Sequence, residues 1–301
     1  MQCFEAEREI VIRQIRNRLR EVEELFYQQR TPIELIDYCV TGRGRGPERP
    51  PEDGWQPFAV HSRWGGFDQT TWFRMTVTIP ESMRGMPVVA LIRPGGESLV
   101  YLNGTPFQGI DSKRDAVFLS ENAQGGEQFC VHLESVPSVQ HDAYHEFGYA
   151  DIAVFDKNSW DVYWDFQVVL EVVSVLPKES VIRRRLLALL EKTIKRIDLR
   201  HPGSTQYYES LTEAREELKH GLEQFRNAGD MGNLVLVGQS HIDTAWLWPL
   251  RETRRKCGRT FSTVLRLMER YPDFLFMASQ PAQLEWIKEH YPEVFQQIRE
   301  R

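Results

Sequence analysis

Residues 233–249 read NLVLVGQSHIDTAWLWP, and this stretch decides the predicted fold. Residues 234–237 form a continuous apolar run, which is typical of a strand covered on both faces in a parallel sheet. Gly238 interrupts the run, and His241 and Asp243 follow where the strand would end, which is where α/β sheets and barrels build their sites. Because residues i and i+2 of an extended chain share a face, we expect both side chains to point at one centre, such as a divalent metal ion.

His241 and Asp243 have two interpretations. A neutral imidazole and a carboxylate can take two positions on a zinc ion, although a catalytic site needs at least one further ligand. The alternative is an ordinary histidine that is hydrogen-bonded to Asp243. Trp246 is a candidate for stacking on a sugar ring, or else a residue packed at the start of a helix. We expect the charged residues 251–256 to form a solvated helix face, with no catalytic role for Glu252.

The pattern after Pro249 predicts a right-handed βαβ unit. A long amphipathic helix follows, then an apolar strand at 274–278, and then a helix with Pro281 in its first turn. One such unit cannot bury both faces of a sheet, and the sequence reaches Arg301 inside a helical pattern without a stop signal. We therefore expect the chain to be the N-terminal part of a longer protein, with its last domain incomplete.

The hydrophobic period divides the remaining sequence. It predicts a multidomain α+β protein with four consecutive parts: an N-terminal helix and linker (1–53), an antiparallel β-sandwich (54–177), a helical linker region (178–232) and the start of a catalytic α/β domain (233–301). We expect an amphipathic helix at 4–28, a short second piece at 33–40 and an Asn103-Gly104 hairpin. Strands are predicted at 72–80, 87–94, 98–104, 116–120, 128–136 and 165–176, and helices at 181–197 and 207–225.

Several aspartates lie near predicted turns and ends. Asp111 and Asp115 are interpreted as turn residues of the sandwich rather than ligand-binding groups. Asp161 and Asp165 are expected to cap local structure or to contact another domain.

Composition excludes some functional classes. The net charge of −6 gives no electrostatic footprint for nucleic acid or an anionic membrane. The sequence has no apolar run long enough to span a bilayer, and the charged start MQCFEAEREIVIRQ does not resemble a secretory signal. The four cysteines are far apart and form no CxxC pair, which favours free thiols in the reducing cytoplasm.

The run from His241 to Trp286 closely resembles the opening of the catalytic domain of glycoside hydrolase family 38 alpha-mannosidases. Residues 51–80, 95–111 and 163–177 are similar to the N-terminal sandwich and helical region of the cytosolic, vacuolar and bacterial branch of that family. The resemblance implies a catalytic domain like a seven-stranded barrel. It also implies retaining hydrolysis of terminal alpha-mannosides in oligosaccharides and assembly into a homo-oligomer through the N-terminal region.

The same resemblance assigns roles to site residues. It makes His241 and Asp243 ligands of one zinc ion, together with a further aspartate and a further histidine, and it places Trp246 against the mannose ring. The further aspartate is also the nucleophile, and we expect it beyond Arg301. No catalytic residue is therefore expected within this chain, which alone should neither bind zinc tightly nor hydrolyse mannosides.

Two other functions remain open from sequence. One is a module for carbohydrate binding or oligomer assembly, in which residues 55–177 bind glycans. The other is a different metal-dependent hydrolase. Such enzymes usually need further histidines soon after an HxD pair, and only His290 follows His241 here.

Overall fold

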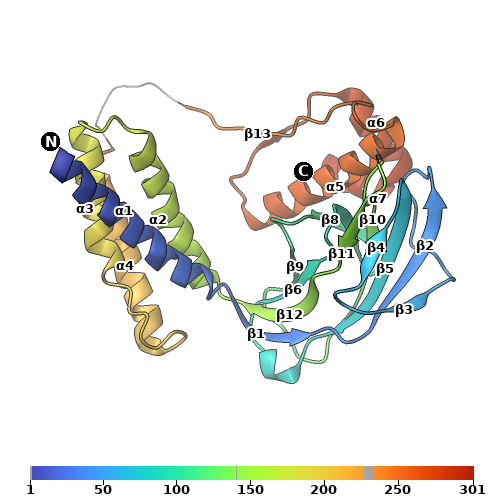
Figure 1. Ribbon diagram of the computed structural model, residues 1–301, viewed down its shortest axis with the longest axis horizontal. Helices are drawn as coiled ribbons and strands as arrows, with labels where there is room; N and C mark the ends of the chain where they lie inside the picture. Colours follow the sequence, from blue (N-terminus) through green and yellow to red (C-terminus); the bar gives the residue numbers. More distant parts are fainter. Residues whose placement is uncertain (1, 140, 227–233) are drawn as a thin grey trace. The chain divides into compact units, whose positions relative to one another are not determined.

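The computed structural model describes residues 2–139, 141–226 and 234–301, drawn in Figure 1. Its contacts divide these residues into two compact units, each of which is described by itself. The helical unit contains residues 2–28 and 155–226, and the sandwich unit contains residues 29–139, 141–154 and 234–301. The contacts thus group the first helix with residues 155–226, and the sandwich with the C-terminal segment. The division of the chain into four consecutive domains remains a prediction.

The helical unit consists of helices packed around one apolar core. Amphipathic patterning places Ile12, Ile15, Leu19 and Val22 of the first helix inside this core, against the second and third helices. Ser204 caps the last helix by accepting a hydrogen bond from the Tyr207 backbone N–H. The helices are α1 (Gln2–Glu23), α2 (Lys157–Val175), α3 (Val181–Ile194) and α4 (Thr205–Glu223).

The predicted strand at 165–176 is wrong, because these residues belong to helix α2. Asp156 caps this helix and accepts hydrogen bonds from the backbone N–H groups of Asn158 and Ser159 at 3.1 Å. The many valines lower the intrinsic helix propensity and suggested a strand. The buried residues Val162, Phe166, Val169, Leu170 and Val173 nevertheless recur at helical spacing, and their packing decides the conformation.

The sandwich unit contains the antiparallel β-sandwich that the sequence predicted. Its six-stranded sheet has the order β3-β2-β5-β10-β7-β8, and its four-stranded sheet has the order β1-β12-β6-β9. Alternation along β5 sends Phe73 and Met75 into the core between the sheets and Trp72 to the opposite face. The strands are β1 (Tyr27–Pro32), β2 (Ile36–Arg43), β3 (Gln56–Phe58), β4 (Arg63–Gly65), β5 (Gln69–Thr78), β6 (Val88–Arg93), β7 (Ser98–Leu102), β8 (Thr105–Ile110), β9 (Ala116–Ser120), β10 (Gln128–Ser135), β11 (Tyr144–Glu146) and β12 (Tyr149–Phe155).

Local turn chemistry is confirmed at one hairpin and differs at another segment. Asn103 and Gly104 join β7 to β8 with φ angles of 50° and 82°, the left-handed values that a tight hairpin requires. The short piece predicted at 33–40 is not separate, because most of it forms β2, which pairs along β5. A one-turn 3₁₀ helix, η1 (Glu81–Met83), lies between β5 and β6.

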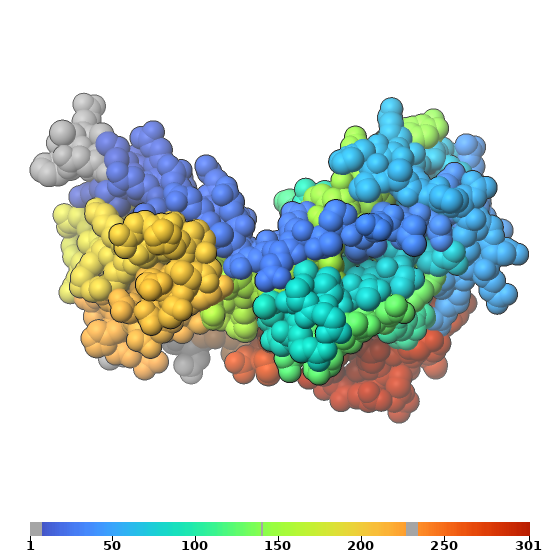
Figure 2. Space-filling model, turned by 90° about the horizontal axis from the view of Figure 1, so that it is seen from below, coloured from blue at the N-terminus to red at the C-terminus, as the bar shows by residue number. Residues whose placement is uncertain are grey.

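The C-terminal segment packs on the outer face of the six-stranded sheet. Cys257, Phe261 and Leu265 of α5 meet Trp72 and Tyr101 of that sheet in one apolar cluster. In Figure 2 this segment, coloured red, lies directly against the sandwich strands. The segment contains β13 (Gly238–Gln239), α5 (Leu250–Arg270), β14 (Phe276–Met277), α6 (Pro281–His290) and α7 (Pro292–Glu300).

The segment confirms the predicted βαβ order and corrects the first strand. Strands β13 and β14 pair in parallel, and α5 connects them. Residues 234–237 do not form a strand, because the parallel pairing begins only at Gly238. A strand that is apolar on both faces needs cover on both faces, and within residues 234–301 and the described sandwich nothing supplies it. The described residues include no closed barrel, and none of their helices is long and apolar enough to cross a bilayer.

Candidate metal site at the end of strand β13

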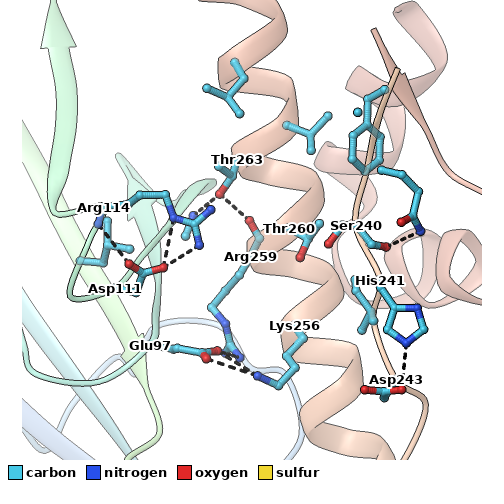
Figure 3. Close-up of a pocket in the computed structure, with 18 of the residues that line it drawn as sticks. Glu97, Asp111, Arg114, Ser240, His241, Asp243, Lys256, Arg259, Thr260 and Thr263 are labelled. Atoms are coloured by element: carbon cyan, nitrogen blue, oxygen red, sulfur yellow. Dashed lines mark hydrogen bonds and ion pairs between the residues drawn. The ribbon is translucent and has the colours of Figure 1, made fainter. Parts of the chain in front are cut away.

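His241 and Asp243 meet just beyond the end of β13. The His241 Nε2 atom lies 3.0 Å from the Asp243 Oδ1 atom, and Figure 3 shows the two side chains pointing at each other. Their exposed side-chain fractions are 77% and 41%, so both are open to solvent. The structure thus brings together the pair that the sequence singled out, in a geometry that fits either a hydrogen-bonded pair or two ligands of one ion.

Ile242 anchors the backbone between the two polar residues. Its side chain is buried in the cluster that contains Cys257, Phe261 and Ile287. Its carbonyl oxygen accepts a hydrogen bond of 3.2 Å from the buried Gln283 side chain at the start of α6. With Ile242 fixed inward, alternation directs both of its neighbours outward to the same side.

Thr253, in the first turns of α5, holds the loop that follows Asp243. Its buried hydroxyl oxygen accepts hydrogen bonds from the Ala245 backbone N–H and from the Trp248 indole N–H, each at 3.1 Å. The hydroxyl also donates to the Asp243 carbonyl oxygen at 3.3 Å. Ala245 has φ of 49°, a left-handed conformation that costs free energy in a residue with a Cβ and therefore needs such support.

The two tryptophans of the loop differ in exposure. Trp246 is 64% exposed, and its ring meets the ring of Trp248 edge-on with centroids 5.5 Å apart. The Lys256 ammonium lies 4.5 Å from the centroid of Trp248. Trp246 therefore offers an open aromatic surface three residues after Asp243 in the chain, whereas Trp248 is tied to α5.

The prediction that residues 251–256 form a solvated helix face is wrong. Arg255 and Glu134 of β10 are each 1% exposed, and the Arg255 Nε atom donates to the Glu134 carboxylate at 2.8 Å. The Arg255 guanidinium also donates hydrogen bonds of 2.8 Å to the Gly46 carbonyl and to the Thr70 hydroxyl. The helix face is charged because the sheet surface opposite it presents charges and polar groups, not because it faces water.

Glu252 belongs to this ionic network. Its carboxylate accepts a hydrogen bond of 2.6 Å from Arg259, which also donates to Glu97 at 2.8 Å. Lys256 binds the same Glu97 carboxylate at 3.0 Å, as Figure 3 shows. A Cβ on Gly109 would lie 2.9 Å from the Arg259 Cβ, so glycine permits this close approach of β8 to α5.

Two carboxyl groups of the network, those of Glu134 and Glu97, have pKa values that are shifted in opposite directions. Burial raises the pKa of Glu134, and the charge of Arg255 only partly opposes that rise. Burial also raises the pKa of Glu97, but the charges of Arg259 and Lys256 outweigh it and lower the pKa below its usual value. Glu97 is therefore ionised in its two ion pairs at neutral pH.

The other aspartates lie in structural roles. Asp111 accepts hydrogen bonds from the backbone N–H groups of Lys113 and Arg114 in its own turn. Asp115 pairs with Arg93 and accepts from the Tyr149 hydroxyl. In the helical unit, Asp161 and Asp165 of α2 both pair with Arg215 of α4. Asp111 thus acts as the turn residue that the sequence suggested, whereas Asp115 lies outside the turn and is mostly buried in its ion pair with Arg93.

A cavity of about 430 Å³ extends from His241 and Asp243 along α5 to the sandwich loop at Asp111 and Arg114. Polar side chains, including Glu97 and Thr260, line one part of it. Apolar side chains of α5 and the β14 strand line the other part. Among the described residues there is no group of three or more His, Cys, Asp or Glu side chains that could hold a metal ion. The site residues gathered here thus supply two candidate ligands.

Sequence reasoning missed Thr253, Glu97 and Glu134. Thr253 lies ten residues after Asp243, and only the chain reversal at Pro249 brings its hydroxyl back to the loop. Glu134 lies 121 residues from Arg255 in the sequence. The available signal for the ionic network was the spacing of Glu252, Arg255 and Arg259, which recur three and four residues apart on one face of α5.

Comparisons with known proteins match both parts of the sandwich unit. The model for the glycosyl hydrolases family 38 N-terminal domain matches residues 231–301, and the model for the alpha-mannosidase jelly roll domain matches residues 47–141. Human alpha-mannosidase 2C1 is 29% identical over 89% of this chain and 27% of its own length. Alpha-mannosidase G of Dictyostelium discoideum is 27% identical over 76% of this chain and 22% of its own length.

Alpha-mannosidase of Saccharomyces cerevisiae is 26% identical over 79% of this chain and 24% of its own length. The chain thus spans about a quarter of the length of these relatives. The descriptions of the two domain models and the names of these relatives all refer to alpha-mannosidases or to glycosyl hydrolase family 38. The chain is thus similar to the alpha-mannosidases of glycosyl hydrolase family 38 over most of its length, and its match to the jelly roll domain precedes its match to the N-terminal hydrolase domain.

Proposed function

We propose that the protein to which this chain belongs is a retaining, zinc-dependent alpha-mannosidase that removes terminal mannose from mannose-containing oligosaccharides. The convergence of His241 and Asp243 at the end of β13 carries this proposal, because it gives the matched hydrolase domain two metal-ligating groups on one centre. Zinc takes imidazole and carboxylate ligands in this combination and leaves positions open in catalytic sites.

The residues present fit one side of a zinc site. His241 Nε2 and Asp243 Oδ1 face each other at the chain surface, and Ile242, Gln283 and Thr253 hold the backbone that carries them. Zinc, when bound, would supply a Lewis acid that polarises sugar hydroxyls. The open face of Trp246 would pack against the mannose ring, because sugars present C–H groups to aromatic faces.

We further propose that this chain alone neither hydrolyses mannosides nor binds zinc tightly. In the part of the chain that the structure describes, His241 and Asp243 are joined by no third ligand. Retaining hydrolysis needs a carboxylate nucleophile and a second carboxyl group as acid and base. We place the nucleophilic aspartate, which would also ligate zinc, beyond Arg301.

The test is to measure mannose release and zinc content in a longer polypeptide that contains this chain. With a nitrophenyl alpha-mannoside as substrate, the longer protein should turn over with one zinc ion per site, and His241→Ala should lose both the metal and the activity. Asp161→Ala, an aspartate in the helical unit, is the matched control and should retain both. Turnover that persists in His241→Ala after chelation would refute zinc-dependent catalysis at this site.

We also propose that the protein forms a homo-oligomer through its N-terminal region in the cytoplasm. The apolar face of α1 is used within the helical unit, but α2 of the same unit exposes Trp164, Val168, Val172 and Val175 along one side. Cys39, Cys130 and Cys257 are free thiols, as a reducing compartment favours. Light scattering should show an oligomer that Val168→Glu dissociates and Glu171→Gln leaves intact.

A further inference from the structure

A second cavity shares part of its wall with the cavity at the candidate metal site. It has a volume of about 570 Å³, within the ~300–1,000 Å³ range of small-molecule pockets. Sandwich residues 95–97, 111–113 and 136–139 line it together with the start of α5. We call this cavity the loop groove. It shares Trp248 and Lys256 with the cavity at His241 and Asp243, so the two are neighbours.

The lining of the loop groove suits an uncharged, polyhydroxylated ligand. Glu97, Asp111 and Glu252 contribute negative charge, and Lys113 and Lys256 contribute positive charge. Because the three carboxylates are already paired with Arg114, Lys256 and Arg259, neither an anion nor a cation is favoured overall. Carboxylates, ammonium groups and a nearby serine hydroxyl provide acceptors and donors for sugar hydroxyls. Trp248 adds an aromatic ring to the same wall.

One buried group in the wall retains hydrogen-bonding capacity. Glu252 is 6% exposed, and its Oε1 atom accepts from Arg259, but its Oε2 atom accepts no hydrogen bond from the residues that the structure describes. That oxygen lies 3.5 Å from the Arg255 Nη1 atom, which is beyond good hydrogen-bond geometry. A buried acceptor without a hydrogen-bond donor is costly, and the charge of Arg255 is the compensation that the described residues supply.

The two neighbouring cavities differ in what would fill them. Part of the cavity at His241 lies beside the edge of the two-stranded sheet and is lined by apolar side chains, namely Val264, Leu267, Phe274 and Phe276. Apolar side chains at a sheet edge are suited to packing against further protein. The loop groove lies among sandwich loops, where its polar groups are already fixed by their own turns and ion pairs. A preformed polar wall suits a ligand better than it suits packed protein.

We propose that the loop groove is a saccharide subsite, through which the sandwich domain holds sugar units of the oligosaccharide next to the terminal mannose. The identity of the sugar in this inference rests on the proposed mannosidase function. The connection between the loop groove and the cavity at His241 rests on the shared lining residues Trp248 and Lys256. It gives the jelly roll domain a part in substrate selection and predicts that longer oligosaccharides bind better than single mannosides.

Saccharide binding by the 301-residue chain itself tests the proposal. A ¹⁵N-labelled sample in the presence of EDTA is titrated with an α-linked mannotriose, and with methyl α-mannoside for comparison. The Trp248 indole N–H, assigned through Trp248→Phe, and the Lys113 amide should shift. The trisaccharide should bind about tenfold more tightly than the monosaccharide, which corresponds to roughly 1.4 kcal/mol.

A steric block locates the binding site. Ser112 is exposed at the rim of the groove, and Ser112→Trp should weaken trisaccharide binding by about tenfold or more. Ser82→Trp places the same side chain on the exposed η1 turn and should bind as the unaltered chain does. Matching amide spectra of the two variants outside their loops confirm that both fold.

The outcomes separate the groove from the proposed function. Loss of binding in Ser112→Trp alone supports the subsite. Absence of any shift with the unaltered chain, or binding that survives Ser112→Trp, overturns it. Maltotriose that binds in place of mannotriose would support a saccharide groove and would count against the mannosidase function, which zinc-dependent mannose release tests separately in the longer polypeptide.

Discussion

The two segments that flank His241 and Asp243 are opposite in burial. Before the pair, Leu234, Val235 and Leu236 are 82%, 75% and 78% exposed. After the pair, α5 carries Arg255 into a site where its side chain is 1% exposed. Residue type alone would predict the reverse. Burial at these positions is therefore decided by tertiary partners. Arg255 is buried because Glu134 on the sheet surface pairs with it, whereas no described element covers Leu234 and Leu236.

Breaking the buried ion pair should have the largest effect. Arg255→Ala removes three hydrogen bonds and leaves Glu134 buried without its counter-charge, so the sandwich unit should lose about 3–5 kcal/mol of unfolding free energy. Urea unfolding measures this loss. Arg84→Ala breaks the exposed pair with Glu81 and should cost only about 0–1 kcal/mol. Equal losses of unfolding free energy in the two variants would show that the buried Arg255 pair stabilises the fold no more than an exposed ion pair does.

Removal of the Thr253 hydroxyl should have the next largest effect. Thr253→Val keeps the shape of the side chain but leaves the Ala245 and Trp248 N–H groups without their acceptor, at a cost of about 1–3 kcal/mol. Hydrogen exchange at the Trp248 indole should become faster. Thr253→Ser restores the hydroxyl and should restore slow exchange. Slow exchange in Thr253→Val would mean that the loop holds its conformation without α5.

The pH dependence of the Glu97 ion pairs should be smaller. The pKa of Glu97 is lowered in the folded chain, so its contribution to stability is complete above the unfolded-state pKa of about 4.3 and is lost as the pH falls through the lower folded-state pKa. Because Glu97 is 53% exposed, we expect Glu97→Gln to cost below about 1 kcal/mol at pH 7.

Unfolding midpoints of the unaltered chain and Glu97→Gln, measured from pH 7 to pH 3, check this prediction. The difference between them should shrink as the solution becomes acidic. A difference that is constant over the whole range would exclude ionised Glu97 as its source.

The exposed apolar run should respond least. Leu236→Ala should change the stability of this chain by less than about 0.5 kcal/mol, because its side chain is already in water. The matched substitution Leu265→Ala, at a residue 4% exposed in α5, should cost about 2–5 kcal/mol. Thermal unfolding of the two variants measures the difference. A large loss of stability in Leu236→Ala would show that residues 234–237 pack against another part of the protein.

The sequence predicted the features that depend on local pattern. The antiparallel sandwich, the Asn103-Gly104 hairpin and the order of strands and helices after Gly238 all follow from hydrophobic period and turn residues. The convergence of His241 and Asp243 follows from their spacing of two along an extended backbone.

Features that depend on distant partners could not be predicted. Valine-rich α2 has strand-like composition, and only the core of the helical unit makes it a helix. Arg255 reads as a surface residue until Glu134, from another domain of the sequence, is placed opposite it. Thr253 becomes part of the site only through the reversal between the loop and α5.

The zinc affinity of the 301-residue chain tests the central claim most directly, because the claim is that His241 and Asp243 form one side of a metal site. A competition titration with a chromophoric chelator should show weak binding at most, and His241→Ala and Asp243→Asn should each abolish it. Tight, stoichiometric binding by the unaltered chain, or binding that is unchanged in both variants, would contradict the assignment of these two residues as a two-ligand half of the site.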